Sequence, residues 1–118
     1  MKEAVIVSTA RTPIAKAYRG GFNMLKGATL GAASVTEAVK RAGIDPGQID
    51  DVIMGSALQQ GTTGGNVARQ IALRAGLPAT VSGMTIDRQC SSGLMAVATA
   101  AKQITEDGMG IVVGGGLD

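Results

Sequence analysis

The only cysteine of the 118-residue sequence, Cys90, lies between two segments with different local preferences. The run before it, 81–86, contains β-branched residues and predicts a strand, whereas the small and apolar run 93–104 predicts a helix. The sulfur is therefore expected at a helix N-terminus, where unpaired amides and the positive end of the helix dipole favour an anion. A thiolate in such a place is a good nucleophile. The alternative is a buried structural cysteine, which is a common fate of free thiols.

Two serines follow Cys90, and their hydroxyl groups could be mistaken for nucleophiles. A serine hydroxyl needs a neighbouring base before it can attack a carbonyl carbon, and histidine is the usual base. The sequence contains no histidine. Ser91 and Ser92 are therefore predicted to cap the following helix, because serine side chains accept hydrogen bonds from first-turn amides.

Several other kinds of site are disfavoured by what the sequence lacks. A single cysteine forms no disulfide within the chain, and without histidine it provides no zinc site of the usual kind. The glycine-rich segments 61–65 and 114–116 match neither the phosphate-loop pattern that ends in Gly-Lys-Ser/Thr nor the dinucleotide pattern Gly-x-Gly-x-x-Gly. One Tyr and one Phe provide no platform for stacking nucleic-acid bases.

Charge is spread along the chain, with 11 basic and 9 acidic residues and a net charge of +2. The one loose basic cluster consists of Arg11, Lys16, Arg19 and Lys26, in a segment that also contains glycine and proline. A solvated loop is the favoured interpretation of this cluster, ahead of a phosphate-binding or nucleic-acid site.

Length and composition predict one globular domain, because 45% of the residues are hydrophobic and 118 residues are few for two domains. The apolar run at the N-terminus is too short for a signal peptide, and no run approaches the length of a membrane span. A lone cysteine fits a reducing compartment. We therefore predict a cytoplasmic protein with no membrane partner, and an organellar form after removal of a transit peptide stays open.

The elements that must position Cys90 alternate between strands and helices. Strands are predicted at 4–8, 51–55, 81–86 and 110–113. Helices are predicted at 29–42, with Thr29 as N-cap, at 66–75 and at 93–104. Gly43 and Gly76 are expected to end the first two helices. This alternation predicts an α/β fold with a mostly parallel sheet.

Three motifs in order resemble those of the thiolases, the family of acetyl-CoA acetyltransferases and 3-ketoacyl-CoA thiolases. Residues 88–94, Arg-Gln-Cys-Ser-Ser-Gly-Leu, resemble the family's nucleophile motif. Residues 8–14, Ser-Thr-Ala-Arg-Thr-Pro-Ile, resemble its opening strand and turn, and residues 61–70 resemble its glycine-rich loop and following helix. The resemblance implies a thiolase-like α-β-α layered fold with a mixed, mostly parallel sheet, of which residues 1–118 form an incomplete N-terminal domain.

The resemblance also implies a chemical role for Cys90. Its sulfur would accept an acyl group, expected to be acetyl, from an acyl-CoA substrate through a thioester, and its backbone amide would help to hold the oxyanion. Such an enzyme makes or cleaves 3-ketoacyl-CoA in fatty acid metabolism and uses CoA thioesters as substrates, with no metal and no further cofactor. CoA-binding residues are not identified by these motifs.

The catalytic groups that thiolases carry in their C-terminal half are absent from these 118 residues. Thiolases use a histidine to activate the cysteine and a second cysteine to move the substrate proton, and this sequence has neither. The polypeptide is therefore expected to be inactive alone. It would be either a fragment or a subunit that joins a second polypeptide in a homo- or hetero-oligomer. A non-catalytic interaction domain and a fragment of another condensing enzyme of the superfamily are the alternatives.

Two positions depart from the family pattern. Asp87 stands where thiolases usually carry asparagine, and a carboxylate facing the sulfur would oppose thiolate formation. The ending Gly-Gly-Gly-Leu-Asp at 114–118 differs from the usual Gly-Gly-Met/Gln-Glu.

The helix 93–104 is apolar nearly all round, so we expect it to be buried on most sides, in part by another polypeptide.

Overall fold

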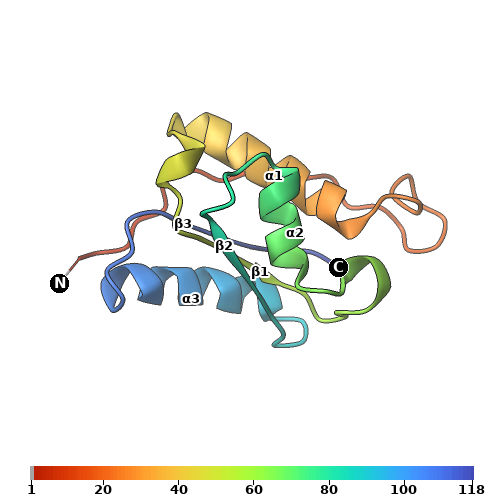
Figure 1. Cartoon of the computed structure of the whole chain (residues 1–118). Coiled ribbons are helices and arrows are strands. Elements are labelled where there is room, and N and C mark those ends of the chain that lie inside the picture. The colour runs from red at the N-terminus through yellow and green to blue at the C-terminus, as the bar shows by residue number, and fades with distance from the viewer. Residues whose placement is uncertain (1) are drawn as a thin grey trace.

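A computed structural model describes residues 2–118 and shows a three-stranded sheet between two layers of helices (Figure 1). The strands β1 (Asp51–Gly55), β2 (Ser82–Ile86) and β3 (Val112–Gly116) are all parallel, in the order β2-β1-β3. The helices are α1 (Gly27–Ala42), α2 (Val67–Arg74) and α3 (Ser92–Thr105), with the short 3-10 helices η1 (Pro46–Gln48) and η2 (Gly61–Thr63). The predicted α/β class and parallel sheet are confirmed.

The central strand β1 is buried on both faces, and its side chains alternate between two cores. Val52 and Met54 pack against α1 and α2, whereas Ile53 packs against Ala96 and Ala100 of α3. Figure 1 shows the same division, with α1 and α2 on one side of the sheet and α3 on the other. A continuous apolar run is the pattern expected of a parallel strand covered on both faces.

Shortening Ile53 tests the core beneath α3. Its side chain is fully buried, so Ile53→Ala should lower the free energy of unfolding by about 2–5 kcal/mol, through lost burial and the cavity left behind. Urea unfolding measures the change. Leu73→Ala is the control, because Leu73 is 50% exposed and should cost far less. Equal losses in the two variants would contradict this description of the core.

Helix α1 begins earlier than the sequence indicates. Lys26 occupies the N-cap position, so the prediction of Thr29 as N-cap is wrong. The Gly27 amide donates instead to the Thr62 hydroxyl oxygen at 2.7 Å, a contact 35 residues away that local sequence does not reveal. The other end is as predicted, because Gly43 has a φ of 66° and closes the helix with a bond to the Lys40 carbonyl.

Strand β3 begins two residues later than predicted, ends three residues later and runs through the glycines. The prediction of 110–113 assumed that consecutive glycines end a strand. Here they belong to it, because α3 approaches the backbone too closely for side chains. A Cβ at Gly114 would lie 3.0 Å from the Val97 Cα, and one at Gly116 would lie 2.9 Å from the Gly93 Cα. Glycine in a strand often marks such a close approach.

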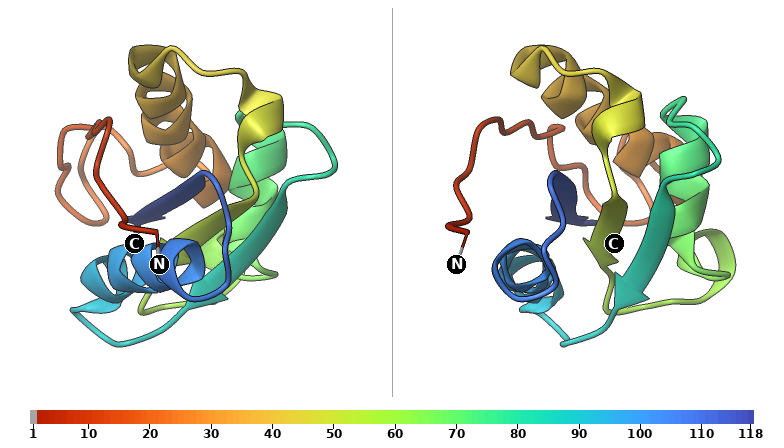
Figure 2. Two further views of the ribbon diagram at one scale, coloured as in Figure 1. Left: turned by 90° about the vertical axis from the view of Figure 1, so that its left-hand side faces the viewer. Right: turned by 60° about the vertical axis from the view of Figure 1, so that its left-hand side comes forward.

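The predicted buried strand at 4–8 is wrong. This segment is extended but pairs with no strand among the described residues, and Val5, Ile6 and Val7 are each 70–75% exposed. Figure 2 shows it running apart from β3, the strand at that edge of the sheet. An apolar β-branched run becomes a buried strand only where an edge pairs with it and a layer covers it.

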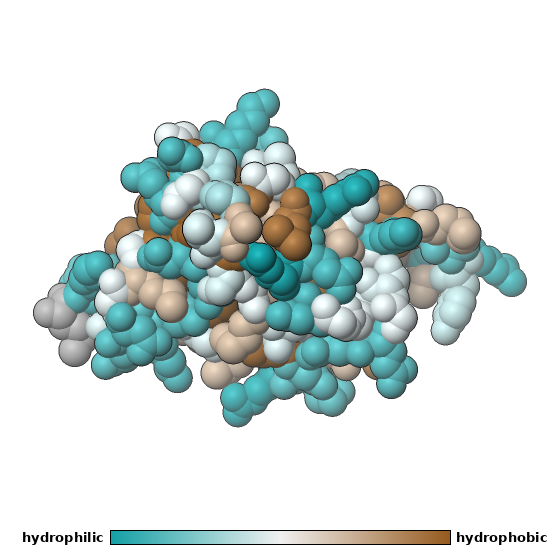
Figure 3. Space-filling view, in the orientation of Figure 1, coloured by the Kyte–Doolittle hydropathy of each residue, from teal (hydrophilic) through white to brown (hydrophobic). Residues whose placement is uncertain are grey.

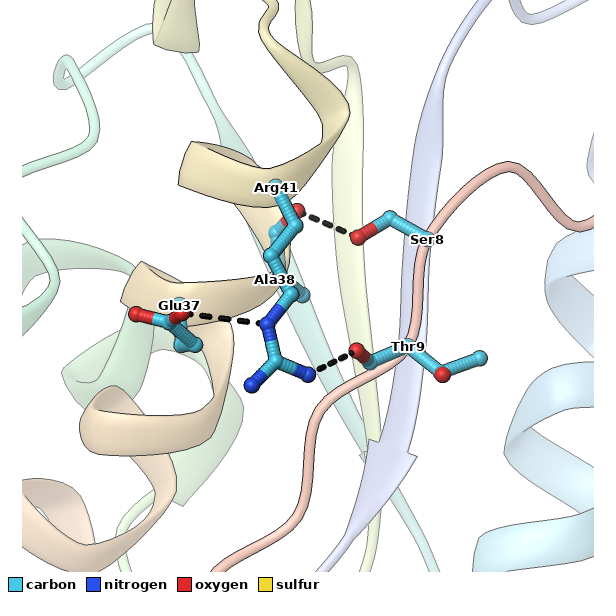
Figure 4. A network of polar contacts seen from close by, with 5 residues as sticks. All are labelled: Ser8, Thr9, Glu37, Ala38 and Arg41. Atoms are coloured by element: carbon cyan, nitrogen blue, oxygen red, sulfur yellow. Dashed lines mark hydrogen bonds and ion pairs between the residues drawn. The ribbon is translucent and has the colours of Figure 1, made fainter.

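Polar contacts attach the end of this segment to α1 (Figure 4). The Ser8 hydroxyl donates to the Ala38 carbonyl at 2.7 Å, and the Arg41 guanidinium donates to the Thr9 carbonyl at 2.8 Å. Arg41 also pairs with Glu37 at 3.0 Å, one turn earlier. Because both charged side chains are about half exposed, this ion pair orients the arginine more than it stabilises the fold.

Within the described residues helix α3 is covered on one side only, and the predicted cover of its remaining surface by another polypeptide stays a prediction. Ser92, Ala96 and Ala100 face the sheet and are buried, whereas Leu94 is 75% exposed on the outer face. Figure 3 shows that hydrophobic atoms on the face of Figure 1 form small patches between hydrophilic ones. Within residues 2–118, no helix combines the length and the apolar character needed to span a bilayer.

Candidate functional site

Cys90 lies in the short connection between β2 and α3, at the carboxyl edge of the parallel sheet. It is two residues before Ser92, the first residue of α3, and its side chain is exposed. The predicted position at a helix N-terminus is confirmed, and the alternative of a buried structural cysteine is wrong. Ligand sites of open parallel sheets usually lie outside the carboxyl ends of the strands, as this thiol does.

The turn that carries Cys90 contains an unusual backbone conformation. Gln89 has a φ of 52°, in the left-handed region that residues other than glycine, asparagine and aspartate rarely adopt. Hydrogen bonds on both sides hold it. The Gln89 amide donates to Asp87 Oδ1 at 2.8 Å, and the Gln89 carbonyl accepts from the Ser92 hydroxyl at 2.6 Å. The turn directly before the thiol is therefore fixed by its neighbours.

The two serines stabilise this turn and do not cap the helix as predicted. Ser91 occupies the N-cap position, but its hydroxyl donates to the Arg88 carbonyl at 2.8 Å and makes no capping bond. The Ser92 hydroxyl accepts from the Arg88 amide at 2.7 Å. The serine hydroxyl groups bind the backbone of residues 88 and 89, and so they are not used to accept hydrogen bonds from the first-turn amides of α3.

Asp87 directs one carboxylate oxygen at its own turn. Since Oδ1 accepts from the Gln89 amide, Asp87 forms the side-chain turn that is common for aspartate before a bend. The departure from asparagine at this position therefore keeps the same hydrogen bond, which either side chain can accept.

The start of α3 rests directly on the ends of β1 and β3. A Cβ at Gly55 would lie 2.1 Å from the carbonyl carbon of Ser92, and Gly116 meets Gly93 backbone to backbone. These contacts set where the helix begins and so where Cys90 stands. Sequence reasoning missed Gly55, because it read this glycine only as the end of a strand.

A second group at the same edge was also missed. Ser56 follows β1 and is fully buried, and its amide donates to the Ile86 carbonyl at the end of β2, at 2.9 Å. Its hydroxyl donates to Asp118 Oδ1 at 3.0 Å. The position of these residues after parallel strands could have revealed the group. Polar residues that follow neighbouring parallel strands, as Ser56 follows β1 and Asp118 follows β3, come together at the carboxyl end of the sheet.

The other polar candidates form no comparable site. Arg11, Lys16, Arg19 and Lys26 are all exposed along the 11–26 segment, as a solvated loop requires. Among residues 2–118, no three side chains of metal-ligating type lie together. A shallow hollow beside the Cys90 turn follows the outer face of α3; it is lined by Arg88, Ser91, Leu94, Met95 and Ala98.

Comparison with known proteins gives consistent matches over the whole fold. The family model described as "Thiolase, N-terminal domain" matches residues 4–118. The 3-ketoacyl-CoA thiolase of Bacillus subtilis is 47% identical over 118 residues, which are 100% of this chain and 30% of that protein. The acetyl-CoA acetyltransferase of Cupriavidus necator gives the same identity and the same coverage.

A solved structure agrees with these matches in three dimensions. The crystal structure of the Bacillus anthracis acetyl-CoA acetyltransferase superposes with a TM-score of 0.91 at 42% identity. The match covers 98% of this chain and 29% of that one. The chain thus spans about 30% of the length of the curated relatives it matches.

Proposed function

The chain belongs to the thiolase family, and from this membership we propose that it is the nucleophile-bearing part of a CoA-dependent thiolase. The observation that carries the proposal is the exposed Cys90 thiol at the start of α3, within a domain that matches the family over residues 4–118. In the reaction, the Cys90 sulfur attacks the thioester carbon of an acyl-CoA, and the CoA thiolate leaves. The α-carbon of a second acetyl-CoA then loses a proton to a base and attacks the acyl-enzyme thioester, acetyl in the simplest case. The new carbon–carbon bond forms 3-ketoacyl-CoA as the bond to the Cys90 sulfur breaks, and the reverse sequence cleaves 3-ketoacyl-CoA.

A cysteine suits this exchange because one thioester replaces another at similar energy. The reaction therefore needs no metal or further cofactor, and CoA thioesters are its only proposed ligands. The negative charge on the thioester oxygen in the transition state needs a donor, and we assign the Cys90 backbone amide to this role. The amide belongs to the turn that Asp87 and Ser92 hold in place.

The remaining catalytic groups must come from beyond these 118 residues, which contain no histidine and no second cysteine. We propose that the missing part of the family's length, or a second polypeptide, supplies both. The same part would cover the outer face of α3, where Leu94 is 75% exposed, and the assembly would be an oligomer. A lone free cysteine makes the reducing cytoplasm the proposed location.

Acetylation of Cys90 tests the proposal directly. Treatment of the full-length protein with acetyl-CoA should add one acetyl group to Cys90, which peptide mass spectrometry can locate. Ser91→Ala is the control, because this serine has only a turn-stabilising bond and acetylation should persist without it. An acetyl group found on serine or lysine, with Cys90 unmodified, would refute the assignment.

A polypeptide of these 118 residues alone should show no thiolase turnover. The activating histidine and the second cysteine are both absent from it, so neither cysteine activation nor proton transfer from the substrate has a group to perform it. An assay of acetoacetyl-CoA formation and cleavage, with the full-length protein as positive control, measures this. Turnover at ordinary enzyme rates would show that the roles carried over from the family are wrong.

A further inference from the structure

The carboxylate of Asp118 joins the ends of two strands. Asp118 comes two residues after β3, and its Oδ1 accepts from three groups that follow β1. These are the Ser56 hydroxyl at 3.0 Å, the Ala57 amide at 2.9 Å and the Leu58 amide at 3.3 Å. Bonds to an ionised acceptor are stronger than those between neutral groups. This single oxygen therefore determines the course of the chain as it leaves β1.

The neighbouring residue holds Asp118 in position. The Leu117 amide donates to the Gly55 carbonyl at 3.0 Å, and the Leu117 side chain packs against the main core. The backbone next to Asp118 is thus held in place by contacts that do not involve the carboxylate. Because the carboxylate binds Ser56, the position of Ser56 depends on the position of β3.

Ser56 connects this carboxylate to the turn that carries the thiol. While its hydroxyl binds Asp118, its amide donates at 2.9 Å to the Ile86 carbonyl, the last of β2. Ile86 directly precedes the Asp87–Cys90 turn. On the other side, Gly55 touches the Ser92 carbonyl carbon, so the two ends of the nucleophile turn both rest on the Gly55–Ser56 backbone.

From this chain of contacts we infer that Asp118 is a positioning residue for Cys90, an inference that rests on the proposed function. Its carboxylate holds Gly55 and Ser56 in the place that sets both ends of the turn, without itself touching the substrate. A displacement of about 1 Å in a catalytic group can lower a rate about 100-fold. Loss of the carboxylate should therefore lower kcat while leaving KM nearly unchanged, because substrate contacts are not removed.

The test compares three variants of the full-length protein in Cys90 acylation by acetyl-CoA. The maximal acylation rate is given as kcat, and the acetyl-CoA concentration at half that rate is given as KM. Asp118→Ala should lower kcat about 10- to 100-fold, with KM changed less than about threefold. Asp118→Asn keeps an oxygen that accepts the same bonds and should stay within about threefold of the unmutated protein. Asp50→Ala is the matched control. Asp50 also carries an exposed carboxylate, which accepts from the Gly110 amide at 2.8 Å, but at the opposite edge of the sheet.

Equal kcat losses in Asp118→Ala and Asp50→Ala would indicate a general effect of stability and would overturn the inference. An Asp118→Ala variant that melts like the Asp50→Ala control and acylates at the unmutated rate would overturn it too. If Asp118→Ala does not fold, Ser56→Ala replaces it. That variant removes one of the three bonds and retains the amide bond to Ile86, and it should lower kcat about threefold. An unchanged kcat in Ser56→Ala would count against the inference in the same way.

Alkylation of Cys90 by iodoacetamide separates this inference from the proposed function. If the unmutated protein takes no acetyl group, the proposed function fails, but the thiol still reacts with iodoacetamide. Asp118→Ala should then be alkylated at least about threefold more slowly at fixed pH than the Asp50→Ala control, because the sulfur loses its fixed place at the helix start. Equal alkylation rates in these two variants would overturn the positioning role.

Discussion

Replacing Cys90 with alanine is expected to lower acyl transfer by the full-length protein by about 10⁴-fold or more, because the proposed acyl-enzyme thioester forms on the Cys90 sulfur. Cys90→Ser should retain little activity, since a hydroxyl is far harder to ionise than a thiol. Because Cys90 is exposed, neither change should shift the free energy of unfolding by more than about 0.5 kcal/mol. Steady-state assays with acetyl-CoA and acetoacetyl-CoA, together with thermal melting, measure both effects.

Activity of Cys90→Ala within about tenfold of the unmutated protein would contradict the assignment of the nucleophile. A contaminating thiolase would produce the same reading, so the acetylated peptide should be sought in the same samples. Ser91→Ala serves as the matched control, because it alters the adjacent side chain and leaves the sulfur in place.

Adding a single methyl group at Gly55 should produce a large loss of stability, because the backbone of α3 lies directly against this glycine. The new Cβ would lie 2.1 Å from the Ser92 carbonyl carbon, a backbone atom with no freedom to turn away. Gly55→Ala must therefore separate β1 from the start of α3, at a cost of about 3 kcal/mol in the free energy of unfolding. The displaced helix should also take Cys90 out of place, so activity should fall as well.

Gly21→Ala is the control for this prediction. A Cβ at Gly21 meets nothing within 4 Å, and its backbone requires no left-handed conformation. This variant should be as stable as the unmutated protein or gain about 0.4–1 kcal/mol through a less flexible unfolded chain. Urea unfolding of both variants gives the comparison. If Gly55→Ala proves as stable as Gly21→Ala, β1 and the start of α3 do not lie in the close contact inferred here.

The sequence predicts well the features that depend on local pattern. Strand β1 lies at 51–55 as predicted, because the apolar run 52–54 is bounded by Asp51 and Gly55, and all five residues are buried. Gly43 ends α1 as predicted, since only its left-handed backbone closes the helix. The place of Cys90 before α3 follows from the same kind of evidence, a β-branched run followed by a run of small residues.

The features that depend on distant contacts could not be predicted in this way. Helix α1 starts at Gly27 because the Thr62 hydroxyl oxygen accepts a hydrogen bond from the Gly27 amide. Strand β3 continues through Gly116 because α3 lies against it. The segment 4–8 has the composition of a strand, but composition does not show whether an edge is present to pair with it. From the sequence, Asp118 is only a departure from the family pattern, because its three hydrogen-bond partners lie about 60 residues earlier.

The small residues between α3 and β3 have a consequence for how this part of the protein tolerates change. Ala96, Ala100 and Gly114 form a thin layer, so the height of the helix above the sheet is determined by residues with almost no side chain. A larger residue at any of these positions would lift α3 as a rigid rod and move the sulfur at its near end. Substitutions at these positions, well separated from Cys90 in the sequence and with no chemistry of their own, would then be measured as losses of activity.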